Sequence, residues 1–186
     1  MPKPFVSPAL CFEPELLLQV QPVRVVFFDV DGVLTDGSLQ FTEQGEAIKR
    51  FNTLDGHGVK LLQKSGITPA VVTGRDSVPL RLRLQQLGVV HAVYGTEDKV
   101  PAAKSILNSL KLDWSQAAAM GDDWPDLPVM QRCAFACAPA NAHQENLAVA
   151  DYVTQALGGH GAVRELCDLL LMAGGHYVRL LREYQR

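Results

Sequence analysis

The sequence predicts an α/β fold, a three-layer and doubly wound parallel sheet of Rossmann-like topology. Short apolar runs alternate with helical periodicity from about residue 23 to residue 173. Continuous apolar strands separated by helices are typical of parallel sheets buried on both faces. At three expected strand-to-helix junctions a proline falls early in the helix, where its missing N–H costs nothing. We expect these junctions at the carboxyl ends of strands, where open α/β sheets bind ligands.

The expected elements follow one another in a regular order. Strands are expected at 23–28, 68–73, 90–95, 117–121, 133–138 and 151–154. Helices are expected at 54–65, 77–87, 99–111, 124–132 and 161–173. Residues 33–53 break the alternation with two short strand-like runs around EQGE, which indicates a β-hairpin. This hairpin is predicted to form a small flap over the carboxyl ends of the strands, in place of a large cap domain.

The same pattern divides the chain into three parts. Residues 1–22 are interpreted as a loosely structured N-terminal extension, 23–173 as the domain itself, and 174–186 as a helical tail. The chain has 186 residues, of which 47% are hydrophobic and 20% charged. These values fit one globular domain with a real core.

Composition excludes several classes of function. A net charge of -3 gives no general attraction to nucleic acid. No apolar run approaches the roughly 20 residues that span a bilayer, and prolines interrupt any signal-peptide core at the N-terminus. Four cysteines are scattered at positions 11, 133, 137 and 167, which favours free thiols in a reducing cytoplasm over a zinc site.

The first expected strand ends in two aspartates, Asp29 and Asp31. A carboxylate can attack phosphorus and split one difficult hydrolysis into two easier steps. The second carboxylate can protonate the leaving oxygen and later accept a proton from water. Because carboxylate and phosphate repel each other, such a reaction needs a hard cation, and Mg²⁺ suits it. Taken alone, the DxDG pattern is also typical of a polar turn at the end of a strand, with no catalytic role.

Three more polar motifs stand at the ends of later strands. Thr73, Gly74 and Arg75 follow the second strand, and Lys99 follows the third. Both motifs could bind a phosphate group, but both are also common at the start of an ordinary helix. The segment GDDWPD follows the fourth strand and places three carboxylates within one turn, where they bind a cation or complement a helix dipole. Four such coincidences at one edge favour an enzyme.

These motifs, in this order, resemble the haloacid dehalogenase superfamily. The segments DVDGVLTDG, DGHGVKLL, VVTGR, GDDWPDLPVM, ADYVT and GGHGAVRELCDLLL narrow the resemblance to its minimal-cap branch, the 3-deoxy-D-manno-octulosonate 8-phosphate phosphatases. The resemblance implies Asp29 as nucleophile and Asp31 as general acid/base. It implies Mg²⁺ bound by the carboxylates of Asp29 and Asp122 and by the main-chain carbonyl of Asp31, with Asp123 as support.

The resemblance also implies how a substrate is held. Thr73 and Lys99 would hold the phosphoryl group, and Gly74 and Arg75 would meet the sugar acid. The resemblance implies a homotetramer in which neighbouring subunits close the active sites. The pathway implied is lipopolysaccharide precursor synthesis, with a small sugar acid phosphate as the substrate.

Two positions depart from the family pattern, and two alternatives stay open. Leu54 and His160 replace arginines that the family usually carries. One alternative is a phosphatase for a nine-carbon sugar acid phosphate or for broader sugar phosphates; Arg75 counts against the nine-carbon case. The other is a non-catalytic scaffold or regulatory domain of the same fold, which would be expected to lose Asp29, Asp31 or Lys99.

Overall fold

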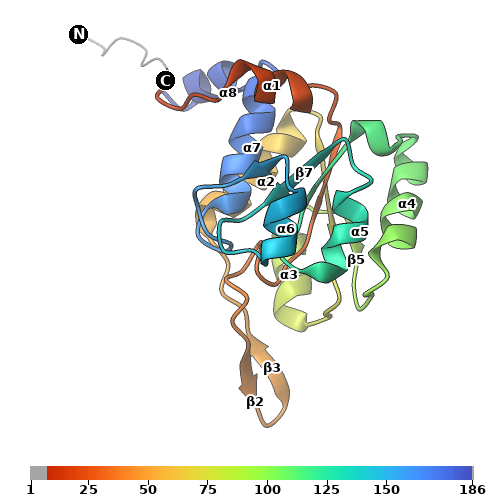
Figure 1. Ribbon diagram of the computed structural model, residues 1–186. Coiled ribbons are helices and arrows are strands. Elements are labelled where there is room, and N and C mark those ends of the chain that lie inside the picture. The colour runs from red at the N-terminus through yellow and green to blue at the C-terminus, as the bar shows by residue number, and fades with distance from the viewer. Residues whose placement is uncertain (1–7, 186) are drawn as a thin grey trace.

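A parallel sheet of six strands forms the centre of the molecule (Figure 1), in the order β5-β4-β1-β6-β7-β8. The computed structural model describes residues 8–185. The strands are β1 (Val25–Phe28), β4 (Thr68–Val72), β5 (His91–Val93), β6 (Ala117–Met120), β7 (Phe135–Ala138) and β8 (Tyr152–Val153). The chain winds outward from β1 in both directions, with Val25 paired to Thr68 on one side and to Ala117 on the other. The predicted doubly wound fold is confirmed.

Helices cover both faces of the sheet because successive strand residues point to opposite sides. Val26 and Phe28 lie in the core on one face, and Val25 and Phe27 in the core on the other. The first face packs against α1 (Pro14–Val20), α2 (Thr53–Lys64), α3 (Val78–Leu87), α7 (Ala162–Ala173) and α8 (Tyr177–Glu183). The second packs against α4 (Lys99–Leu110), α5 (Leu127–Met130) and α6 (Gln144–Val149). The 3₁₀ turns η1 (Trp114–Gln116) and η2 (Trp124–Asp126) complete the elements.

The predicted flap is present as a separate antiparallel hairpin. Strands β2 (Gln40–Thr42) and β3 (Gly45–Ile48) pair with each other and project from the body of the molecule (Figure 1). The hairpin leaves the core just after β1, so its base lies beside the carboxyl ends of the central strands. No helix among residues 8–185 is long and apolar enough to cross a bilayer.

Two short helices differ from the sequence-based expectation. Residues 14–20, expected to be loose, form α1, which has Pro14 at its start and packs against α7. Leu16, Leu17 and the buried Val20 join the core, so burial of an apolar face stabilises a helix that the nearby prolines obscured. Helix α6 was missed because six residues give no clear period. Residues 1–7 of the expected extension lie outside the described residues.

The buried Asp55 links α2 to the start of α7. Its carboxylate accepts the backbone N–H of Gly161 at 3.3 Å and that of Arg164 at 2.8 Å, and the residue is 1% exposed. We expect Asp55→Ala to lower the free energy of unfolding by about 1–3 kcal/mol, because helix N–H groups lose a buried partner. Urea unfolding measures this. Asp113→Ala, which removes an exposed cap of η1, is the control; an equally small loss in both variants would contradict the prediction.

Candidate active site

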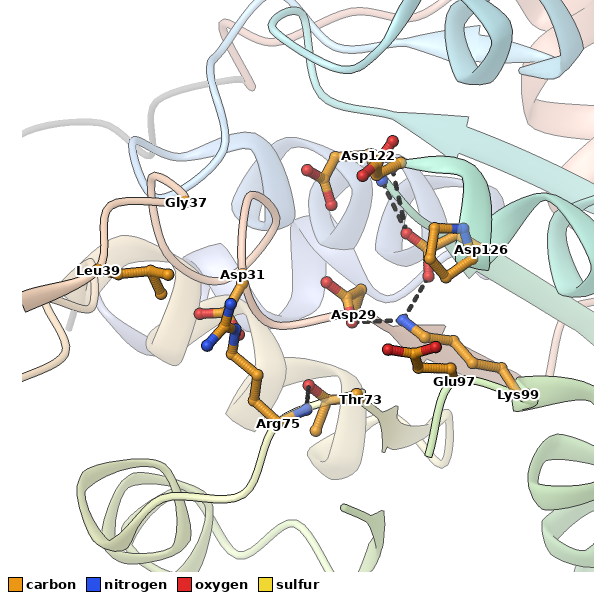
Figure 2. Close-up of a pocket in the computed structure, with 13 residues that line it drawn as sticks. Asp29, Asp31, Gly37, Leu39, Thr73, Arg75, Glu97, Lys99, Asp122 and Asp126 are labelled. Atoms are coloured by element: carbon orange, nitrogen blue, oxygen red, sulfur yellow. Dashed lines mark hydrogen bonds and ion pairs between the residues drawn. The ribbon is translucent and has the colours of Figure 1, made fainter. Parts of the chain in front are cut away.

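The eight predicted site residues line one pocket of about 580 Å³ at the carboxyl edge of the sheet (Figure 2). Asp29 follows β1, Thr73 follows β4, Lys99 opens α4, and Asp122 lies just beyond β6. Parallel strands bring their carboxyl ends to a common edge. Side chains far apart in the sequence therefore meet in one place.

Asp29 lies at the buried end of this pocket. Its backbone N–H donates to the carbonyl of Met120 at 3.1 Å, which fixes the residue against β6. Burial, and then the nearby Asp126 carboxylate, raise the pKa of Asp29 to about 6, against the opposing attraction of Lys99. Burial thus withdraws this carboxylate from water and disfavours its ionised form.

Lys99 and Asp126 form the electrostatic centre of the site. The Lys99 ammonium is buried and lies 2.6 Å from both Asp29 Oδ1 and Asp126 Oδ1. Although burial lowers the pKa of Lys99, the two carboxylates outweigh it and the pKa lies above its ordinary value. The second oxygen of Asp126 accepts the backbone N–H groups of Asp122 and Asp123, at 3.1 and 3.4 Å. Asp126 therefore orients both Lys99 and the acidic loop.

Asp122 faces the loop that carries Asp29. A Cβ atom at Gly32 would lie 2.0 Å from Asp122 Oδ2, so only glycine fits there, and its φ of +97° also favours glycine. Burial, followed by repulsion from Asp29 and Asp126, raises the pKa of Asp122 to about 8. A carboxylate in this position is stabilised by added positive charge.

The acidic cluster fits a hard divalent cation. One oxygen each from Asp29, Asp122 and Asp126 lies within 4.8 Å of the others. Because Lys99 and backbone N–H groups already occupy the oxygens of Asp126, Asp29 and Asp122 are the carboxylates with capacity left for an ion. Oxygen ligands with uncompensated negative charge are what Mg²⁺ prefers. Asp123 lines the pocket and caps η2 by accepting the N–H of Trp124 at 2.8 Å.

The TGR segment forms the opposite wall. Thr73 is buried, and its hydroxyl oxygen accepts the backbone N–H of Arg75 at 3.3 Å. Gly74 has room for close approach of a ligand, since the nearest atom to an added Cβ is 3.8 Å away. The Arg75 side chain is 46% exposed and reaches over the pocket, with Nε 3.7 Å from Asp31 Oδ2.

Comparison with known proteins identifies the family. The sequence profile of haloacid dehalogenase-like hydrolases matches residues 93–166. The chain is 39% identical to 3-deoxy-D-manno-octulosonate 8-phosphate phosphatase KdsC of Salmonella typhimurium over 94% of this chain and 95% of that protein. The chain belongs to the KdsC phosphatase family.

Solved structures of KdsC phosphatases share the fold. The Yersinia pestis enzyme superposes with a TM-score of 0.86 at 40% identity, over 88% of this chain and 89% of that one. The Moraxella catarrhalis enzyme, solved with magnesium, phosphate and a KDO molecule, gives a TM-score of 0.88 at 34% identity, over 91% and 98% of the two chains.

Several pocket residues were not predicted from the KdsC-like motifs. The GDDWPD motif predicts that Asp126 binds a cation or complements a helix dipole, but it does not predict the contact of Asp126 with Lys99. Leu39 and Glu97 also line the pocket. Lys49, at the end of the flap, forms an ion pair with Asp31; nothing in the local sequence indicated that contact.

The two departures from the KdsC pattern lie outside this pocket lining. Leu54 is 56% exposed in the first turn of α2. His160 is exposed, and its Nε2 lies 3.2 Å from a guanidinium nitrogen of Arg50. The same guanidinium forms an ion pair with Asp36 at 2.6 Å. Both positions therefore leave the contacts among Asp29, Lys99 and the acidic loop unchanged.

Proposed function

We propose that this chain is a Mg²⁺-dependent phosphatase that hydrolyses 3-deoxy-D-manno-octulosonate 8-phosphate to the free sugar acid and phosphate. The proposal rests on the buried contact of Lys99 with Asp29 and Asp126, which lies beside Asp122. It is supported by the match to the Salmonella typhimurium KdsC phosphatase, which covers 95% of that protein. We place the reaction in the cytoplasm, in lipopolysaccharide precursor synthesis. The four free cysteines, all within the described part of the chain, are consistent with that compartment.

Asp29 and Asp31 divide the chemistry between them. An Asp29 oxygen attacks the phosphorus, and the ester P–O bond breaks with its electron pair kept by the sugar oxygen. Asp31 gives that oxygen a proton and is left as a carboxylate. Water then attacks the phosphorus of the aspartyl-phosphate while Asp31 takes a proton from the water. The bond between phosphorus and the Asp29 oxygen breaks, which releases phosphate and restores the Asp29 carboxylate. Asp29, Asp122 and the Asp31 main-chain carbonyl would hold Mg²⁺, which would offset negative charge on the phosphoryl oxygens.

Other residues hold the two ends of the substrate. In this proposal Thr73 and Lys99 hold the phosphoryl group, and Asp123 supports the acidic loop. Lys99 is shared between two carboxylates, whereas Arg75 has only a 3.7 Å contact with Asp31. Arg75, beside Gly74, is therefore the better cation for the sugar carboxylate.

A panel of phosphate esters tests the function. Phosphate release is measured with and without Mg²⁺ on 3-deoxy-D-manno-octulosonate 8-phosphate, a nine-carbon sugar acid phosphate and simple sugar phosphates. We expect a preference for the first ester over the simple sugar phosphates of at least about 10²-fold in kcat/KM, because these esters lack the carboxylate and losing a charged contact costs several kcal/mol. The nine-carbon ester keeps a carboxylate, so for it we expect only slower turnover. Equal turnover of all esters would contradict the substrate assignment. No Mg²⁺-dependent release from any ester would favour the scaffold alternative.

We propose in addition that the protein works as a homotetramer. The flap presents the apolar side chains of Leu39, Phe41 and Ile48, which are 41%, 62% and 57% exposed. An exposed apolar surface beside an open pocket suits contact with a second copy, which would also exclude water from the site. Mass measurement in solution should give four copies, and Phe41→Ser should reduce that number. A monomeric wild-type protein would contradict the proposal.

A further inference from the structure

Lys49 connects the flap to the catalytic loop. It comes directly after β3, and its side chain is only 1% exposed. Its ammonium forms ion pairs with Asp31 Oδ1 and, at 2.6 Å, with Glu46 Oε1. A buried ammonium is stable only when partners of this kind compensate it. The contact with Asp31 is therefore a fixed part of the fold, unlike a solvated surface pair.

This ion pair determines how the Asp31 carboxylate is held. Within residues 8–185, the hydrogen bond that the structure shows to the Asp31 carboxylate is donated by the Lys49 ammonium. Arg75 Nε stands 3.7 Å from the other oxygen, beyond hydrogen-bond distance. Without Lys49, a carboxylate on a loop would rotate among several staggered positions. A proton donor in the wrong position transfers its proton poorly, because transfer requires hydrogen-bond reach.

The same contact fixes the base of the flap. Strands β2 and β3 form a sheet of their own, and an isolated two-stranded hairpin is marginally stable in water. Lys49 binds Asp31, and the next residue, Arg50, binds Asp36 at 2.6 Å. Both carboxylates belong to the loop that follows β1. The position of the flap and the orientation of Asp31 are thus coupled through two neighbouring residues.

We propose that Lys49 is a positioning residue, which aligns Asp31 for proton transfer and couples that alignment to the flap. The inference rests on the proposed function of Asp31 as general acid. The proton matters most when the leaving oxygen is a poor leaving group. A sugar alkoxide needs the proton as the P–O bond breaks, whereas p-nitrophenolate departs without it. Loss of alignment therefore slows the sugar phosphate selectively.

Leaving-group dependence tests the alignment. We expect Lys49→Met to lower kcat/KM about 10²-fold for the sugar phosphate and less than about 5-fold for p-nitrophenyl phosphate. Lys49→Arg should recover much of the selective loss. The control is Lys104→Met, which makes the same charge change at an exposed position of α4 and should change neither value. An equal loss with both esters, as from a general structural defect, would overturn the inference, and so would no loss.

Hydrogen exchange tests the coupling without relying on catalysis. Lys49→Met and Asp31→Ala should each speed amide exchange in residues 40–48, and the double variant should add little to either. Additive effects, or unchanged exchange, would overturn the coupling. A wild-type chain that hydrolyses neither ester would overturn the proposed function and with it the aligning role. The exchange result would still decide whether the ion pair holds the flap.

Discussion

Asp29→Asn should abolish phosphatase activity, lowering kcat by roughly 10⁴-fold or more, as loss of a nucleophile does in other hydrolases. The amide keeps the shape of the side chain but cannot form the aspartyl-phosphate. Folding should not suffer. Because burial raises the pKa of Asp29 to about 6, the ionised carboxylate opposes folding at neutral pH, and a neutral isostere removes that cost.

Two measurements decide the Asp29 prediction. Phosphate release in the presence of Mg²⁺ reports the chemistry, and thermal unfolding in EDTA reports the fold. Asp113→Asn, at an exposed cap, provides the control and should keep full activity. Activity above about 1% of wild type in Asp29→Asn, after exclusion of deamidation by mass spectrometry, would contradict the role of Asp29 as nucleophile.

Removal of Mg²⁺ should destabilise the protein more at pH 8 than at pH 5. In the metal-free protein the pKa of Asp29 is raised to about 6 and that of Asp122 to about 8, while both carboxyls titrate near pH 4 when unfolded. Between pH 4 and pH 8 the folded state therefore holds more protons than the unfolded state. Its stability falls as pH rises through this interval. Mg²⁺ binds the ionised carboxylates, so its stabilising effect grows over the same interval.

Thermal unfolding in EDTA and in excess Mg²⁺, from pH 5 to pH 8.5, measures this effect. The difference between the two curves is the quantity to compare, because Asp55 and Asp168 also have raised pKa values that follow from burial. Asp122→Asn should remove most of the pH dependence of that difference. The same Mg²⁺ effect at pH 5 and pH 8 would contradict the prediction.

Much of this architecture was predictable because it follows from short-range patterns. Buried parallel strands appear as continuous apolar runs, so β1, β4 and β6 were located within one or two residues. The motifs after those strands then had to meet, and the structure brings all eight expected residues to one pocket.

The parts that were missed depend on contacts across the chain. Lys49 lies 18 residues from Asp31, and only the reversal of the hairpin brings them together. The three carboxylates of the GDDWPD segment are equivalent in sequence, whereas the geometry of η2 turns Asp126 toward Lys99. Helix α1 is short, and burial against α7 stabilises it more than its local propensity does.

The dispersed origin of the pocket has a consequence for cooperativity. Its functional groups come from four separate segments, around Asp29, Thr73, Lys99 and Asp122, each attached to a different part of the central sheet. No single segment carries a working fraction of the site, so a partly melted sheet cannot retain catalysis. Turnover and sheet content should therefore disappear at the same denaturant concentration, which makes catalysis a direct measure of the intact native population.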